Sequence, residues 1–223
     1  MLHKSIVPHF PLEIEIAKEP VNYQFAIEKM QMRIAAIHEE KASGLLWFLE
    51  HPSLYTAGTS AKEKDLLKPD EFPVYEAGRG GQYTYHGPGQ LIIYCLVDLR
   101  KISLDVRKYV KTLEYWILSV LKIHGVEGAL YADRIGVWVR PPETKKESKI
   151  AAIGVRVTHG ITWHGLSFNI EPNLTHYNNI VPCGISDFGV TSLRDIGLTA
   201  TLDEIICAFC ATIPTCFVGK VQK

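Results

Sequence analysis

Apolar residues recur at helical spacing in three segments of the chain. Residues 22–41 and 105–124 carry them at intervals of three and four, and a glycine follows each segment closely, so both are predicted to be amphipathic helices. A third helix is predicted over 202–212, where Thr201 and Glu204 have the spacing of a capping box. In the second helix, the apolar side that is predicted to face inward consists of Val106, Val110, Leu113, Trp116, Ile117, Val120 and Leu121.

Shorter apolar runs predict β-strands. The largely apolar runs at 45–49 and 91–99 are typical of buried strands. In the second half of the chain, segments rich in Val, Ile and Trp at 129–140, 149–157 and 161–170 predict three consecutive strands. A His-Gly turn is predicted to join the last two of these strands.

The order of these elements indicates one mixed fold. Residues 51–73 hold three prolines and a glycine among polar residues, and we expect them to form a loop. The sequence contains no internal repeat and no linker long enough to separate domains. We therefore predict that residues 1–223 form a single α/β (α+β) domain with a mixed, largely antiparallel sheet and flanking helices.

Composition excludes several classes of protein. The 223 residues are 47% hydrophobic, and 24 Lys and Arg balance 24 Asp and Glu. A disordered chain would be less hydrophobic, and a nucleic-acid-binding protein usually has a basic excess. The sequence has no apolar run of the length of a membrane span and no secretory signal. We expect a cytoplasmic protein without membrane or nucleic-acid partners, whose five cysteines are reduced thiols.

Residues 78–90, with the sequence GRGGQYTYHGPGQ, contain five glycines in thirteen positions. Glycine lets a ligand approach the backbone closely and leaves N–H groups available as donors. The spacing matches neither a phosphate-binding P-loop nor a dinucleotide fingerprint. A tight turn between two strands would explain the glycines but neither Arg79 nor His86. A loop that surrounds a small ligand or an acyl thioester is therefore the functional interpretation.

Among the cysteines, Cys183 is the candidate nucleophile. It lies between Pro182 and Gly184 in a segment that we expect to be a loop, where a thiol can be exposed and backbone N–H groups can stabilise an oxyanion. These residues alone leave a purely structural role for Cys183 equally open. The other cysteines are predicted to be packing residues, and they are Cys95, Cys207, Cys210 and Cys216.

A nucleophilic cysteine needs a cation or a base beside it, because a thiol with an ordinary pKa of about 8.5 is mostly protonated at neutral pH. His86, His164, His176 and Lys149 are the candidates for this role. Lys149 begins the strand KIAAIGVRV. A solvated strand end next to a cluster of lysines is the usual explanation for such a residue.

Four motifs follow one another along the chain: RGGQYTYHGPGQ at 79–90, SKIAAIGVRV at 148–157, HGLSFNI at 164–170 and PCGI…GVTSL at 182–193. In their order and spacing they resemble the octanoyltransferases of lipoate biosynthesis, also called lipoyl(octanoyl) transferases or the lipoate-protein ligase B family. The resemblance covers most of the chain from about 45 to 196. The departures from the family pattern are mild, and Gly165 stands where the family is expected to have Asn or Gly.

The resemblance implies an acyltransferase of protein lipoylation. It would move an octanoyl group from octanoyl-acyl carrier protein to a lysine of lipoyl domains, in 2-oxoacid dehydrogenase complexes and in the glycine cleavage H protein. By motif position, Cys183 would carry the acyl-thioester intermediate, and Lys149 would lower the pKa of the thiol and act as general acid and base. Transfer between thioesters needs neither ATP nor a cofactor. The implied fold resembles the catalytic domain of biotin and lipoate protein ligases.

The same motif positions imply where the substrate binds. No metal is implied, since the His and Cys residues lack the spacing of a zinc site. The expected substrate-binding residues are Arg79, Gly80, Gly81, Gln82, Tyr83, Thr84, Tyr85, His86, Ala152, Ile153, Gly154, Gly165, Leu166 and Ser167. Because both partners resemble acidic carrier domains, a local basic patch is expected at Arg79, Lys145, Lys146 and Lys149.

Three other functions compete with this interpretation. An ATP-dependent lipoate or biotin protein ligase also has a glycine-rich loop, but it has no need of a reactive cysteine, so the PCGI segment favours the transferase. A non-catalytic acyl- or carrier-binding module would keep an apolar pocket without requiring Cys183 and Lys149 together. A thioester hydrolase would use His86 or His164 as its base and would release free octanoate.

Overall fold

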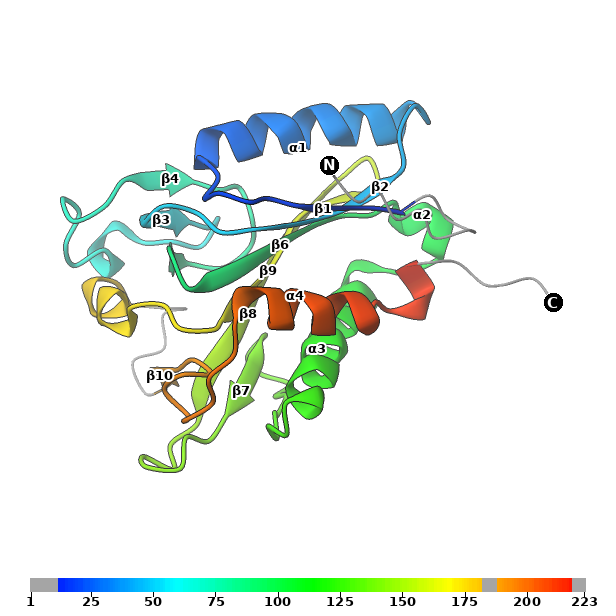
Figure 1. The fold of residues 1–223 in the computed structure, drawn as a ribbon. Helices are drawn as coiled ribbons and strands as arrows, with labels where there is room; N and C mark the ends of the chain where they lie inside the picture. Colours follow the sequence, from blue (N-terminus) through cyan, green and yellow to red (C-terminus); the bar gives the residue numbers. More distant parts are fainter. Residues whose placement is uncertain (1–11, 182–187, 218–223) are drawn as a thin grey trace.

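The computed structural model describes residues 12–181 and 188–217, in which helices cover both faces of a large mixed sheet (Figure 1). The strands follow the order β1-β2-β6-β9-β8-β10, and β7 pairs with β8. The β1–β2 and β8–β10 pairs are parallel and the others are antiparallel, as the predicted mixed sheet requires. The strands of this sheet are β1 (Leu12–Ile16), β2 (Gly44–Leu49), β6 (Gln90–Leu96), β7 (Val137–Val139), β8 (Ser148–Thr158), β9 (Ile161–Asn169) and β10 (Gly189–Val190).

A second, three-stranded sheet lies beside the first, in the order β4-β3-β5. Its strands are β3 (Leu54–Ala57), β4 (Val74–Glu76) and β5 (Tyr83–His86). The prediction of a loop over 51–73 is wrong at β3, which is only four residues long and too short for alternation to stand out between Pro52 and Gly58. β5 lies inside the glycine-rich segment, so part of that segment is a strand.

Helix α1 (Tyr23–His38) covers one face of the large sheet (Figure 1). Asn22 caps it, because its side chain accepts a hydrogen bond from the N–H of Phe25 at 3.2 Å. Its buried stripe packs against β2 and β6 and consists of Ala26, Met30, Ile34 and Ile37. The periodicity of residues 22–41 therefore predicts the helix and its buried side.

Helices α3 (Val106–Ile123) and α4 (Leu202–Ala211) cover the opposite face. They contact each other through Trp116, whose indole N–H donates to the carbonyl of Phe209 at 3.0 Å. The predicted capping box of α4 is present. Five of the seven α3 residues expected to face inward are buried, but Val106 is exposed and Val110 is half-buried. The prediction is wrong for these two valines, which border a cleft.

Shorter helical turns link the main elements. They are η1 (Glu63–Asp65), α2 (Leu99–Ile102), η2 (Leu174–Asn179) and η4 (Thr215–Phe217). The side chain of Asn173 caps η2 by accepting from the N–H of Thr175 at 3.1 Å. Within the described ranges no helix has both the length and the apolar character to cross a bilayer.

The hairpin of β8 and β9 lies between β6 and the short strands β7 and β10. Its turn is the predicted His159-Gly160, and both residues have positive φ, 54° and 80°. Two such residues form a tight turn whose twist suits the paired strands. The strand predicted over 129–140 is largely absent: β7 has three residues, and before it Ala129 makes only a single bridge to Trp138. Gly136, with φ of 121°, interrupts the extended backbone.

Candidate active site

A cleft of about 930 Å³ wraps around the outer edge of β8. On the α1 side of the sheet, its walls include Ile92 and Tyr94 of β6. On the α3 side, they include Ile153 and Val155, which pack against the α3–α4 core. Within the described residues β7 pairs with β8 only as far as Ala151, so the cleft has access to the edge beyond.

Small residues form the floor of the cleft in two cross-strand pairs. Ala152 lies opposite Ser167, and Gly154 lies opposite Gly165. A Cβ on Gly165 would stand 2.2 Å from the carbonyl oxygen of Ile93, a distance that real side chains do not tolerate. The structure therefore requires glycine at position 165, where the family resemblance allowed Asn or Gly. The result is a shallow trough over β8 and β9.

A β-bulge turns Lys149 toward this trough. Trp138 pairs with Lys149 and Val137 pairs with Ala151, so one step along β7 matches two steps along β8. The extra residue, Ile150, reverses the alternation of side chains between the two faces. Lys149 and Ala152, three residues apart, consequently line the same cleft. Without the bulge they would point to opposite faces of the sheet.

Lys149 is buried, with 9% of its surface exposed. Its Nζ lies 4.8 Å from the centre of the Trp138 indole, within the range of a cation–π contact. Gly136 leaves room for the lysine stem, since a Cβ there would stand 3.3 Å from Lys149 Cε. The interpretation of Lys149 as a solvated strand end is therefore wrong. A buried lysine in a cleft is a candidate for acid–base chemistry.

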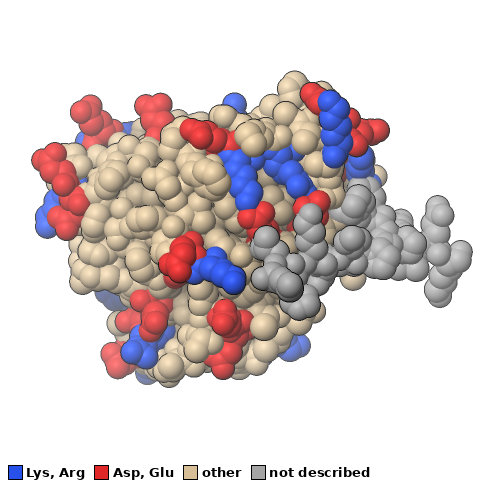
Figure 2. Space-filling model, turned by 45° about the horizontal axis from the view of Figure 1, so that its top comes forward, with Lys and Arg blue, Asp and Glu red and all other residues tan. Residues whose placement is uncertain are grey.

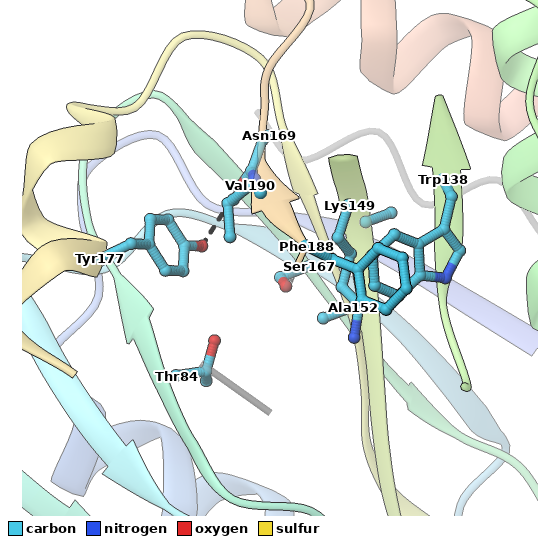
Figure 3. A pocket seen from close by; sticks show the side chains of 11 residues that line it. Thr84, Trp138, Lys149, Ala152, Ser167, Asn169, Tyr177, Phe188 and Val190 are labelled. Atoms are coloured by element: carbon cyan, nitrogen blue, oxygen red, sulfur yellow. Dashed lines mark hydrogen bonds between the residues drawn. The ribbon is translucent and has the colours of Figure 1, made fainter. Parts of the chain in front are cut away.

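A small chamber adjoins the cleft at Lys149. Figure 3 shows the ammonium group and the rings of Trp138 and Phe188 on one side, and the hydroxyls of Thr84 and Tyr177 on the other. Ser167 and Asn169 complete the polar lining.

The predicted nucleophile Cys183 lies outside the described residues. The chain on its C-terminal side returns to the chamber at Phe188. Val190 of β10 then pairs with Lys149, and the N–H of Thr191 donates to the carbonyl of Lys149 at 3.0 Å.

The glycine-rich segment forms the roof of the trough. Arg79 lies over Gly154, where a Cβ would stand 2.7 Å from Arg79 Cδ. Its guanidinium donates to the carbonyl and the hydroxyl of Thr56 at 3.0 and 2.7 Å. The N–H of Gly80 donates to the carbonyl of Val155 at 3.3 Å, which ties the roof to the edge of β8.

A buried hydrogen-bond chain joins the roof to the chamber. His86 Nδ1–H donates to Gln90 Oε1 at 2.6 Å, and Gln90 Nε2 donates to Asn169 Oδ1 at 2.9 Å. Asn169 Nδ2 then donates to the carbonyl of Thr191 at 2.9 Å. Burial, together with the nearby His51, lowers the pKa of His86 to about 3. His86 is neutral at neutral pH and acts as a link in this chain.

Tyr94 and His164 line the far end of the trough, and His51 supports Tyr94 through a hydrogen bond. Tyr94 donates to His51 Nε2 at 2.7 Å, while His51 Nδ1–H donates to the carbonyl of Val21 at 2.6 Å. His164 Nε2–H donates to the carbonyl of Ala77 at 2.9 Å. Burial lowers the pKa of His51 and of His164 to about 4, with the charge of Arg79 adding to the effect on His164.

The structure brings the predicted substrate-binding residues together around one cleft. The exception is Tyr85, which is absent from its lining because it packs on the other side of β5, with its hydroxyl 3.0 Å from Ser53 Oγ. Within β5, Thr84 and His86 line the cleft and Tyr85 points to the other side, as alternation requires. Tyr83, the first residue of the strand, also borders the cleft. The predicted basic patch is wrong: Arg79 and Lys149 are each 9% exposed, so only Lys145 and Lys146 remain at the surface.

The cysteine predictions hold in part. Cys95 is buried and burial raises the pKa of its thiol far above the usual range. Cys210 and Cys216 are half-buried against the core. Cys207 is exposed, so its assignment to core packing is wrong. Cys207 lies on the outward side of α4. Its neighbours in the sequence are apolar, so the sequence does not reveal that its side chain faces solvent.

Several residues of the site were missed in the sequence. Gln90 and Asn169 stand inside two of the quoted motifs, but an amide side chain carries no chemical signal of its own. Trp138, Gly136 and Glu114 are visible only once the bulge and the cleft are known. Glu114 is buried on α3, where it pairs with Lys111 at 2.8 Å and accepts from the N–H of Gly136 at 3.1 Å.

Comparison with known proteins places this geometry in a family. The sequence profile described as Lipoyl protein ligase A/B catalytic domain matches residues 21–213. A protein of Paramagnetospirillum magneticum named Octanoyltransferase is 52% identical over 209 residues, which cover 94% of this chain and 98% of the relative. One of Parvibaculum lavamentivorans with the same name is 54% identical over 195 residues, covering 86% and 87%.

Solved structures agree on the fold. A bipartite lipoate protein ligase from Thermoplasma acidophilum superposes with a TM-score of 0.65 at 15% identity, over 91% of this chain and 82% of that chain. A lipoate-protein ligase A bound with ATP gives a TM-score of 0.63 at 15% identity, over 91% and 84%. Likeness at this identity concerns the fold alone.

Proposed function

The chain belongs to the lipoyl protein ligase A/B catalytic-domain family and, within it, to the octanoyltransferases, and from this premise we propose that it transfers an octanoyl group through a thioester on Cys183. The observation that carries the proposal is Lys149. It is a buried lysine that a β-bulge turns into the cleft, beside the point where the chain returns from the segment containing Cys183.

The first half-reaction loads the enzyme. Lys149, in its neutral form, takes the proton of the Cys183 thiol, and the sulfur attacks the carbonyl carbon of the donor thioester. The new carbon–sulfur bond forms as the bond to the donor sulfur breaks, and the Lys149 ammonium returns the proton to the leaving thiolate. This exchange of one thioester for another needs no external energy source. The face of Trp138, 4.8 Å from Nζ, stabilises the cationic form while the proton resides there.

The second half-reaction unloads the enzyme. The acceptor amine attacks the acyl carbon on Cys183, and neutral Lys149 takes the proton that the nitrogen loses. The carbon–nitrogen bond forms, the carbon–sulfur bond breaks, and Lys149 gives the proton back to the Cys183 sulfur. The hydroxyls of Thr84 and Ser167 line the chamber and are available to donate to the developing oxyanion (Figure 3).

The proposed donor is octanoyl-acyl carrier protein. The proposed acceptors are lipoyl domains of 2-oxoacid dehydrogenase complexes and the glycine cleavage H protein. No ATP and no cofactor enter this scheme, and the chain acts as one catalytic domain. A nucleophilic thiol must stay reduced, so the proposal assigns the enzyme to the cytoplasm.

Two rival functions have less support. An ATP-dependent ligase shares the fold, but the relatives that are about half identical to this chain are named octanoyltransferases. A hydrolase with His86 or His164 as base is disfavoured because the pKa of these groups is lowered to about 3 and about 4. A base that weak removes few protons at neutral pH.

Intact-mass spectrometry tests the proposal. We expect the protein incubated with octanoyl carrier protein, without ATP, to gain one octanoyl group and to lose it when an apo lipoyl domain is added. Cys183→Ala should gain none. Cys207→Ala, which removes an exposed thiol on α4, is the matched control and should behave as the unmodified protein. An octanoyl adduct on Cys183→Ala, or transfer that requires ATP and Mg²⁺, would contradict the proposal.

A further inference from the structure

The α3 side of the cleft has an opening that the proposed chemistry does not use. Five residues of α3 line it, at positions i, i+1, i+4, i+5 and i+8 of one helix face: Val106, Arg107, Val110, Lys111 and Glu114. Val106 is 42% exposed, and Ile135 on the facing loop is 56% exposed. Exposed apolar residues at the rim of a cleft are typical of a surface that receives a partner.

This helix face leads from solvent to Lys149. Glu114 follows Val106 by eight positions, which corresponds to about 12 Å along a helix. At the inner end Glu114 holds the N–H of Gly136 at 3.1 Å, and Gly136 packs against the stem of Lys149. The half-buried Val110 lies between the two ends. The stripe is narrow and partly apolar, so a flexible arm can follow it whereas a folded domain must stay outside.

The charges at the outer end are unusual for a helix start. The first turn of α3 has no acidic residue and carries Arg107 and Lys108, although the positive end of the helix dipole disfavours cations. Lys108 pairs with the capping residue Asp105 at 3.6 Å, and Lys111 pairs with Glu114. Within the described residues the guanidinium of Arg107 has no ion-pair partner.

The other charged residues on this side of the cleft are Lys111, Glu114, Asp133 and Arg134. Glu114 pairs with Lys111 and Arg134 pairs with Glu147, so Asp133 on the opposite loop is the acidic residue that could compete for Arg107. On the side of the molecule that carries α1, basic and acidic side chains alternate, with no large area of one sign (Figure 2). Arg107 is exposed, lies beside a channel to Lys149 and is unfavourable for its own helix. An acidic partner that binds at this rim would give a reason for its position.

We propose that Val106, Arg107 and Ile135 form the docking surface for the acidic carrier domain of the donor, and that the stripe from Val106 to Glu114 admits its thioester arm. This inference rests on the proposed function, because it assumes a donor thioester on a carrier. It replaces the basic patch expected at Arg79, Lys145, Lys146 and Lys149, two of which are buried.

Steady-state kinetics with two donors separates docking from chemistry. One donor is octanoyl carrier protein, and the other is octanoyl-pantetheine, which has the arm without the domain or its charges. Arg107→Glu should raise KM for octanoyl carrier protein about tenfold and leave kcat/KM for octanoyl-pantetheine within about twofold. Lys108→Glu, the neighbouring residue outside the cleft lining, is the matched control and should change neither.

Stability and salt provide further checks. A Glu in the first turn suits the helix dipole, so both variants should keep or slightly raise the melting temperature. Salt at about 0.5 M should remove most of the difference between Arg107→Glu and the unmodified protein. Val110→Phe narrows the stripe midway and should lower kcat/KM for both donors at least tenfold.

Each outcome has one meaning. The docking surface is overturned if Arg107→Glu and Lys108→Glu change the KM for octanoyl carrier protein equally. It is also overturned if Arg107→Glu lowers kcat/KM for both donors, or if it changes only the KM for the acceptor. Unchanged kinetics of Val110→Phe overturns the channel. Use of octanoyl-pantetheine but not of octanoyl carrier protein by the unmodified protein overturns the carrier as donor. If neither donor acylates the unmodified protein, the proposed function itself fails.

Discussion

The two ends of the cleft bury polar groups in opposite ways. At one end, a β-bulge holds the amine of Lys149 against the face of Trp138 and beside a polar chamber. At the other end, His51 and His164 are buried as neutral rings that donate to backbone carbonyls. The first end holds Lys149, the residue that we propose as the proton carrier. The second end has its polar groups fixed in one protonation state.

The two ends of the cleft should therefore respond differently to substitution, one in the rate of the reaction and the other in the stability of the fold. A group that exchanges protons during turnover affects the rate most, whereas neutral buried groups that are fully hydrogen-bonded mainly affect folding. Changes at the Lys149 end should therefore lower activity more than stability. Changes at the histidine end should alter stability and its dependence on pH.

The largest effect is expected from removing the amine of Lys149. Lys149→Met keeps the stem that packs beside Gly136 and deletes the proposed proton acceptor. We expect kcat to fall by about 10² to 10⁴, the usual contribution of general acid–base catalysis, while the melting temperature changes little. Single-turnover acylation followed by mass spectrometry measures it. Lys145→Met, at an exposed lysine in the preceding loop, is the control. A variant with more than a tenth of the original rate would show that Lys149 has no role in proton transfer.

The second prediction tests the support of Lys149. In Gly136→Ala, a Cβ would stand 2.7 Å from the carbonyl oxygen of Ala151 and 3.3 Å from Lys149 Cε, at a φ of 121°. Gly125→Ala is the matched control, since Gly125 also has positive φ, 71°, but has nothing within 4 Å of the added atom. The control should lose about 1 kcal/mol from backbone strain alone.

Gly136→Ala should lose roughly 1–3 kcal/mol more than the control, the range for forcing an extra carbon into a packed site, and should also lower kcat. Urea unfolding measures the free energy of unfolding of both variants. Equal losses would mean that the space around the lysine stem is not tightly packed, and the first end of the cleft would then be less rigid than we infer.

The sequence predicted the scaffold of both ends but not their difference. Periodicity predicts α1, α3 and the β8–β9 hairpin because each is long enough to repeat its pattern. It places Val106 and Val110 in the core, since a valine that borders a cleft is no different in sequence from one that packs. The family motifs mark most of the residues around the cleft, but Tyr85 faces away from it.

The direction of Lys149 could not be predicted from spacing. Counted along an uninterrupted strand, Lys149 and Ala152 lie on opposite faces, and only the bulge at Ile150 brings them together. Such a bulge depends on how β7 pairs with β8, which spacing along one strand does not reveal. The neutral state of His51 likewise follows from burial between distant segments, and His51 has no motif of its own.

The third prediction uses pH at the histidine end. Burial lowers the pKa of His51 and of His164 from 6.5 to about 4. The unfolded chain therefore binds more protons between pH 6.5 and 4, so stability is full above about 6.5 and is lost as pH falls through the window. Each such histidine contributes a slope of up to about 1.4 kcal/mol per pH unit.

His164→Asn should flatten this slope by about one proton. Asn tolerates the positive φ of 57° at this position, so the backbone can remain as it is. The free energy of unfolding in urea, measured from pH 4 to pH 7, tests it. His159→Asn is the matched control, because it makes the same substitution at an exposed histidine with a similar φ of 54°. Parallel curves for His164→Asn and the unmodified protein would show that His164 is not neutral in the folded state.

The smallest effects are expected for the free energy of unfolding when two buried tyrosines at the histidine end of the cleft are changed to phenylalanine. Tyr94 donates to His51 Nε2 at 2.7 Å, so Tyr94→Phe leaves a buried acceptor without its donor and should cost about 1–3 kcal/mol. The hydroxyl of Tyr23 is also buried, and burial raises its pKa to about 12, but it has no hydrogen-bond partner within the described residues. Tyr23→Phe removes a polar group that has already lost its water, so its free energy of unfolding should stay within about 0.5 kcal/mol of the original or rise. Urea unfolding of the two variants gives the comparison directly. If Tyr23→Phe loses as much free energy of unfolding as Tyr94→Phe, the hydroxyl of Tyr23 must have a hydrogen-bond partner in solution. The far end of the trough would then bind polar groups as the Lys149 end does.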